Sequence, residues 1–104
     1  MSKNAEKEIV EISALMIEGK LNLIEGCRKL VSLRHQTGYA ENEIFFPVRG
    51  VDSETDHFPL GSMREHCSKE YLERSDKEIA EYLSDCESEI IDSCKSIISF
   101  FQEK

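Results

Sequence analysis

Apolar residues recur every three to four positions at the start of the chain, a spacing typical of helices that bury one face. The first such run is Ala5, Ile9, Ile12 and Met16. It predicts a helix over residues 5–18, capped by Asn4 and ended by Gly19 in a left-handed conformation. A second helix is predicted from Asn22, which has capping-box spacing to Glu25. The short link between the two helices predicts an antiparallel hairpin.

The most regular apolar pattern lies at the other end of the chain. Its residues step by four and three positions: Ile79, Leu83, Cys86, Ile90, Cys94, Ile97 and Phe101. They predict one long helix that begins at a Ser75–Glu78 capping box and packs on the hairpin. A short helix capped by Ser68 and one or two turns over residues 63–67 are expected before it. Acidic residues, among them Glu81 and Asp85, occupy the outer face of the long helix.

Residues 39–61 interrupt the helical pattern. They contain both prolines together with Gly50 and Gly61, so we expect an ordered loop and no helix there. Phe45 and other apolar side chains are expected to hold the loop against the helices. Ordered loops on helical scaffolds often carry binding residues. This one contains a close group of polar side chains: Asp52, Glu54, Asp56 and His57.

These elements together predict a single all-α domain, which suits a chain of 104 residues. The expected architecture is a small helical bundle with an N-terminal helical hairpin, a long ordered central loop and a long C-terminal helix. Gly26 interrupts the second helix at a cost of about 1 kcal/mol relative to alanine, which indicates close approach of a neighbouring helix. Ile98 and Phe100 lie off the apolar face of the last helix. We expect them to meet the aromatic side chains of the loop, the alternative being exposure to a partner.

Charge narrows the classes of partner. The net charge is −8, and it is uneven: residues 1–40 carry +1, residues 41–74 carry −4 and residues 75–104 carry −5. Acidic surfaces repel phosphates, so direct nucleic acid binding is disfavoured, whereas basic proteins are attracted. Solubility alone is the alternative explanation. No apolar run reaches the ~20 residues that span a bilayer, and the N-terminus is polar, which predicts a cytoplasmic protein without membrane contact.

Candidate chemistry is sparse. The four cysteines, Cys27, Cys67, Cys86 and Cys94, lack the C-x-x-C spacing of zinc or redox sites and are expected to be small core residues in a reducing compartment. The spacing of the acids at 52, 54 and 56 lacks the later glycine and glutamate of a calcium loop. The histidines, His35, His57 and His66, are more simply explained as ordinary hydrogen-bonded or surface residues. No nucleophile elbow or phosphate-binding loop occurs, so neither an enzyme, a metal nor a cofactor is expected.

Three stretches carry a resemblance to a known family: Ile24–Leu30, Leu33–His35 and Gly50–Gly61, the last of which includes an Asp-Ser-Glu-Thr-Asp segment. Over about residues 20–98 the chain resembles a family of small uncharacterised bacterial proteins. The members of that family look like immunity proteins encoded beside polymorphic toxins, such as those of contact-dependent growth inhibition. The resemblance implies a non-catalytic, cytoplasmic helical protein that binds a toxin domain tightly.

The expected function is therefore neutralisation of a basic toxin domain, a nuclease in the simplest case, by occlusion of its phosphate-binding active site. The expected partner-binding residues are Asp52, Glu54, Asp56, His57, Glu65, Glu81 and Asp85. Two alternatives stay open. One is a small hydrolase or metal-dependent enzyme that uses His57, His66 and nearby acids; the other is a helical adaptor or homo-oligomer.

Overall fold

The fold is described by a computed structural model that covers residues 3–103. Its elements are α1 (Lys3–Ile17), α2 (Leu23–Leu33), a 3-10 turn (Arg34–Gln36), a second 3-10 turn (Glu43–Phe45), α3 (Phe46–Thr55), a third 3-10 turn (Gly61–His66) and α4 (Lys69–Glu103). No strand occurs within this range, which confirms the all-α prediction. Across the same residues, no helix has the length and apolarity that crossing a membrane demands.

The N-terminal hairpin forms where the sequence predicts it. Gly19 adopts φ +75°, and its N–H donates to the carbonyl of Met16 at 3.2 Å, which ends α1 in the expected left-handed conformation. Asn22 caps α2, because its Oδ1 accepts from the N–H groups of Ile24 and Glu25 at 3.0 Å. The prediction that Asn4 caps the first helix is wrong, because α1 begins at Lys3 and includes Asn4 in its first turn.

Gly26 is a point of close approach between α1 and α2, as its place in the sequence predicts. A Cβ built on Gly26 would lie 2.4 Å from Sδ and 2.6 Å from Cγ of Met16. Met16 is itself 1 % exposed, so the thioether fills the space that glycine leaves. The unfavourable helix propensity of glycine is offset here by tight packing between the two helices.

The predicted long loop over residues 39–61 is wrong. This segment contains a 3-10 turn followed directly by the ten-residue helix α3. Pro47 lies in the first turn of α3. A backbone N–H at this position has no partner within the helix, so proline removes no hydrogen bond there, and its fixed φ suits a helix. Gly50 is tolerated in the middle of the helix at about 1 kcal/mol.

Helical spacing explains why α3 forms despite these two residues. Val48, Val51 and Thr55 are buried and stand three and four positions apart, so one face of α3 packs into the core. Phe45, just before the helix, is fully buried. Burial of this face outweighs the weak local propensity, since most helical stability in proteins comes from tertiary packing.

The last helix is longer than expected. The Ser75 capping box does not form: α4 begins at Lys69 and runs without a break through Ser75, which is 4 % exposed. Ser68 caps the helix as predicted, because its Oγ accepts from the N–H of Tyr71 at 3.1 Å. No glycine or proline lies between Ser68 and Ser75. The predicted short helix therefore continues into the long one as a single helix.

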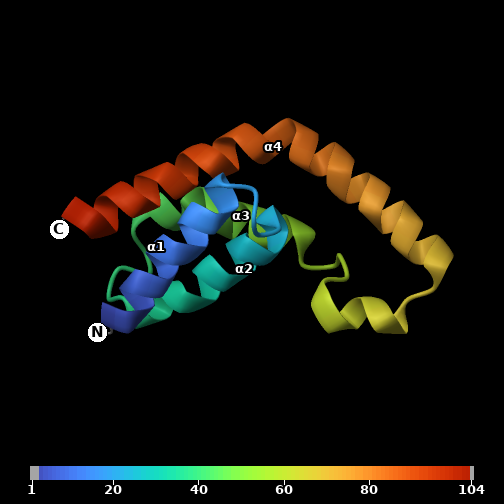
Figure 1. The fold of residues 1–104 in the computed structure, drawn as a ribbon, viewed down its shortest axis with the longest axis horizontal. Helices are drawn as coiled ribbons and strands as arrows, with labels where there is room; N and C mark the ends of the chain where they lie inside the picture. Colours follow the sequence, from blue (N-terminus) through green and yellow to red (C-terminus); the bar gives the residue numbers. More distant parts are fainter. Residues whose placement is uncertain (1–2, 104) are drawn as a thin grey trace.

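The buried apolar residues of α4 all lie in its C-terminal half, whereas Tyr82, Leu83 and Cys86 pack against the edge of the core. These buried residues are Ile90, Cys94, Ile97 and Phe101. The Gly61–His66 turn leads from α3 to the start of α4, whose N-terminal half lies beyond α1–α3, as Figure 1 shows. The predicted core positions Ile79, Leu83 and Cys86 are therefore only half-buried. Among the helices, α1 makes the most extensive contact with α4.

Aromatic rings join the end of α4 to the central segment. Phe100 packs edge-on against Tyr39, with ring centroids 5.2 Å apart, and Phe101 lies 6.1 Å from Phe45. Ile98 is half-buried. The expectation that Phe100 meets the aromatic side chains of residues 39–61 is confirmed, and this cluster fixes the start of α3.

The cysteines are predicted to differ in reactivity. Burial raises the pKa of Cys27 from 9.0 to about 12 and that of Cys94 from 9.0 to about 11, whereas Cys67 and Cys86 are half-buried. Since the thiolate is the reactive form, Ellman's reagent at pH 8 is expected to label Cys67 first and Cys27 and Cys94 only on unfolding. Because folding raises these two pKa values, their contribution to stability is full below pH 9 and declines as pH rises from about 9 to 12.

Urea titrations at pH 7, 9 and 10 would measure this decline, with a Cys27→Ala, Cys94→Ala variant as the control in which the decline is weaker. Rapid labelling of all four thiols in the folded protein would contradict the prediction.

Candidate functional site

Arg28 of α2 holds the C-terminal end of α3. Its guanidinium donates to the carbonyl oxygens of Thr55 and Phe58, the second at 3.3 Å. Its Nε also lies 3.6 Å from Oδ1 of Asp52. A cation at this position adds a donor to carbonyls at and just beyond the helix end and opposes the negative end of the helix dipole. Asp52, an expected partner contact, therefore joins α3 to α2.

Glu54 faces α4 and is held there by Tyr82. The Tyr82 hydroxyl donates to Oε2 of Glu54 at 2.6 Å. Burial, followed by this hydrogen bond, raises the pKa of Tyr82 above its ordinary value of 10.0, so the phenol stays protonated and continues to donate. The carboxylate of Glu54 thus has a fixed position beside α4.

A groove of about 370 Å³ lies between α3 and α4. The residues that line it are Phe46, Pro47, Gly50, Val51, Glu54, Tyr82, Asp85, Cys86 and Glu89. We call it the α3–α4 groove. Three of these side chains are carboxylates, and no described residue of the lining is a lysine or an arginine. The groove brings together Glu54 and Asp85, two of the predicted partner-binding residues.

The thiol of Cys86 shows how closely the acids gather. Burial raises the pKa of Cys86, and the hydrogen bond with Tyr82 lowers it. The nearby carboxylates of Glu89, Glu54 and Asp85 raise it further. All three carboxylates therefore act on one side chain within the groove. A cation entering this groove would be stabilised by the same field.

Phe46 borders the groove and is exposed over 54 % of its surface. The guanidinium of Arg49 lies 5.8 Å from the centre of its ring. Arg49 also donates to Oε2 of Glu41 at 3.2 Å, and it is not among the residues that line the groove. The groove consequently joins an exposed aromatic ring to three carboxylates.

The remaining predicted site residues do not line this groove. Asp56 and His57 follow α3 and are exposed, and the His57 ring lies 4.1 Å from that of Phe58, centre to centre. Glu65 lies in the Gly61–His66 turn and Glu81 on the exposed face of α4. Asp52 and Glu54 point to different sides of α3, because successive residues of a helix are rotated by about 100°.

The histidines and cysteines are the side chains best suited to hold a metal ion. Within residues 3–103, no three His, Cys, Asp or Glu side chains are grouped so that they could hold a metal ion. Nε2 of His35 lies 2.8 Å from Nη1 of Arg34, and the thiol of Cys67 donates to the carbonyl of Met63 at 3.5 Å. These contacts give His35 and Cys67 local structural partners.

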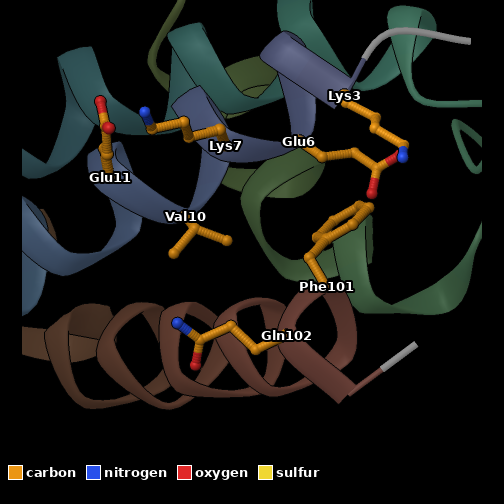
Figure 2. Close-up of a pocket in the computed structure, with 7 residues that line it drawn as sticks. All are labelled: Lys3, Glu6, Lys7, Val10, Glu11, Phe101 and Gln102. Carbon is orange, nitrogen blue, oxygen red and sulfur yellow. The ribbon is translucent and has the colours of Figure 1, made fainter.

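Four other hollows on the described residues contain none of the seven predicted partner-binding residues, and two of them border α4 at opposite ends. One, of about 560 Å³, lies between α1 and the end of α4 (Figure 2). It is lined by Lys3, Glu6, Lys7, Val10, Glu11, Phe101 and Gln102, so its two lysines and two glutamates balance. The second, of about 410 Å³, lies under the N-terminal half of α4, where Arg64 donates to both carboxylate oxygens of Asp76 at 2.8 and 2.9 Å. Neither has the one-sided charge of the α3–α4 groove.

Sequence reasoning did not include Phe46, Tyr82 or Glu89 of the groove among the partner-binding residues. Phe46 was assigned to a loop, although the spacing of Val48, Val51 and Thr55 is the signal that places it at the start of a helix. Tyr82 stands three positions before Asp85 and so shares a helix face with it. That spacing was readable from the sequence once Glu54 was placed on a helix facing α4.

Comparisons with protein-family models, with curated proteins and with solved structures found no match to this chain. The family resemblance of residues 20–98 thus stays a prediction from the residues themselves.

Proposed function

We propose that this protein is an immunity protein that binds a basic toxin domain and blocks the toxin's active site. The observation that carries the proposal is the α3–α4 groove, which joins Glu54, Asp85 and Glu89 to the exposed ring of Phe46. The net charge of −8 and the family resemblance of residues 20–98 support the same function.

Electrostatics explains how such a protein would act. A nuclease active site holds phosphates, so it presents lysine, arginine and other donor groups. Carboxylates on a neighbouring protein can occupy these donors and keep the substrate out, and complementary charge also speeds the encounter. An exposed aromatic ring beside the carboxylates supplies the apolar contact that the centre of a stable interface needs. The toxin in this proposal is a protein with a basic active site, and a nuclease is its simplest form.

Co-expression with the product of the adjacent upstream gene tests the proposal. We expect the two proteins to co-purify, with a Kd of 1 μM or below, roughly 8 kcal/mol or more of binding free energy. We also expect the association rate constant to fall by about tenfold or more between 50 and 500 mM salt, because exposed charges are screened. Growth of cells that express the toxin should be restored by this chain.

A charge-matched control is available on the hairpin. Glu8→Lys with Glu11→Lys changes the net charge as much as Glu54→Lys with Asp85→Lys, and both pairs are exposed. The hairpin pair should retain neutralisation, whereas the groove pair should lose it. Absence of association at micromolar concentration would overturn the proposed function.

The alternatives receive no specific support. His57 packs against Phe58, and Phe100 packs against Tyr39. These contacts give ordinary structural explanations for the side chains that the hydrolase and the adaptor alternatives would use.

A further inference from the structure

We propose that the α3–α4 groove is the seat for a single arginine side chain that the partner protein inserts between the two helices. This inference rests on the proposed function, because it names the chemistry of the partner group that the binding surface receives. The shape of the groove, its charge and its aromatic residues all favour an arginine.

The negative charge of the α3–α4 groove favours a positively charged occupant. Glu54, Asp85 and Glu89 lie along a groove of about 370 Å³, and no lysine or arginine is among the described residues that line it. Oε2 of Glu54 already accepts from Tyr82 at 2.6 Å, which orients the carboxylate without neutralising it. Three carboxylates around one groove repel one another, and an entering cation would relieve that repulsion. The occupant therefore carries positive charge.

The apolar residues of the groove favour a guanidinium over an ammonium. Phe46, Pro47 and Val51 line it on α3, and the ring of Tyr82 lines it on α4. Guanidinium is planar and weakly hydrated, so it stacks on rings while donating two parallel hydrogen bonds to a carboxylate. Lysine is a strongly hydrated point charge and gains little from such surfaces. Arg49 already lies 5.8 Å from the Phe46 ring centre, which shows that this ring accepts a guanidinium.

Gly50 borders open space in the groove. It sits inside α3 with a helical φ, and a Cβ built on it would meet nothing within 4 Å. Glycine in a helix interior costs about 1 kcal/mol relative to alanine, and no packing contact within the chain requires it here. The open space beside Gly50 gives the aliphatic part of an arginine room to pass along α3.

A small probe tests the inference without the toxin. ¹⁵N-labelled protein is titrated with N-acetyl-arginine methylamide and, separately, with N-acetyl-lysine methylamide at 20 mM salt. We expect saturable shifts of the backbone signals of Gly50, Glu54, Asp85 and Glu89, with half-saturation at roughly 1–10 mM for the arginine probe. The lysine probe should bind at least about threefold more weakly. Equal shifts at Glu65 and Glu81, or no saturable shift, would overturn the inference.

Matched variants separate the groove from general acidity. Glu54→Gln with Asp85→Asn should weaken binding of the arginine probe by about fivefold or more, whereas Glu65→Gln with Glu81→Gln should change it by less than about twofold. Gly50→Arg places a guanidinium in the groove from α3 itself and should abolish the shifts, while Gly50→Ala should preserve them. Amide spectra with unchanged dispersion confirm that each variant is folded. Retention of probe binding by Gly50→Arg would contradict the proposed seat.

The two proposals fail separately. A chain that binds the upstream gene product but shows no groove-specific arginine binding keeps the immunity function and loses the arginine seat. A chain that binds the arginine probe in the groove but no upstream product keeps the seat and loses the immunity function.

Discussion

Replacing Phe45 with alanine is expected to lower the free energy of unfolding by about 3–5 kcal/mol, whereas replacing its neighbour Phe46 should change it by less than about 0.5 kcal/mol. Phe45 is 0 % exposed and lies 6.1 Å from the ring of Phe101, so its removal leaves a cavity at the point where α3 meets α4. Phe46 is 54 % exposed. Urea unfolding monitored by circular dichroism measures both values.

The variants Phe45→Ala and Phe46→Ala also distinguish a loss of stability from a loss of binding. Because Phe46 borders the α3–α4 groove, Phe46→Ala should weaken binding of the arginine probe while leaving stability unchanged. Phe45→Ala is the stability control, and its loss should exceed that of Phe46→Ala by several kcal/mol. Equal losses of stability at the two positions would contradict the assignment of Phe45 to the core.

The same two residues show what the sequence could and could not predict in this region. Their apolar character correctly indicated an ordered segment. The prolines and Gly50 led to a loop because local propensity was given more weight than spacing. Pro47 falls in the one part of a helix that tolerates it, and burial of Val48 and Val51 supplies the stabilisation that propensity lacks.

Local signals were most reliable where one side chain or one dihedral angle decides the structure. Gly19 and Asn22 act as predicted, because a left-handed φ and a capping oxygen each depend on a single residue. Ser75 has the same capping-box spacing and forms no cap. A capping signal marks a helix start only where the preceding residues cannot continue the helix, and residues 69–74 can.

The candidate site was predictable in its residue types but not in its grouping. Sequence proximity suggested that Asp52, Glu54 and Asp56 would act together. Asp52 and Glu54 lie on α3 and diverge, because Asp52 pairs with Arg28 on α2 and Glu54 accepts from Tyr82 on α4. Asp56 lies just beyond the end of the helix. Glu54 and Asp85 meet only because α3 and α4 pack side by side, a long-range contact that no local pattern encodes.

Gly26 and Gly50 both lie inside helices, but replacing each with alanine should change the free energy of unfolding in opposite directions. Gly26→Ala is expected to lower the free energy of unfolding by about 1–3 kcal/mol, since the new Cβ would lie 2.4 Å from Sδ of Met16. Gly50→Ala is expected to raise it by about 0.5–1 kcal/mol, since nothing lies within 4 Å of that Cβ. Thermal unfolding should show shifts of opposite sign, about 4–8 °C per kcal/mol.

Met16 provides the matched control for the first of these changes. Its side chain is 1 % exposed and its Sδ lies 3.8 Å from Sγ of Cys94, so the thioether has little room to move away from an added methyl group. In a Met16→Ala background the cost of Gly26→Ala should fall to near zero or reverse, because the clash is gone and only helix propensity remains. An unchanged cost in that background would place the effect of Gly26 outside the α1–α2 contact.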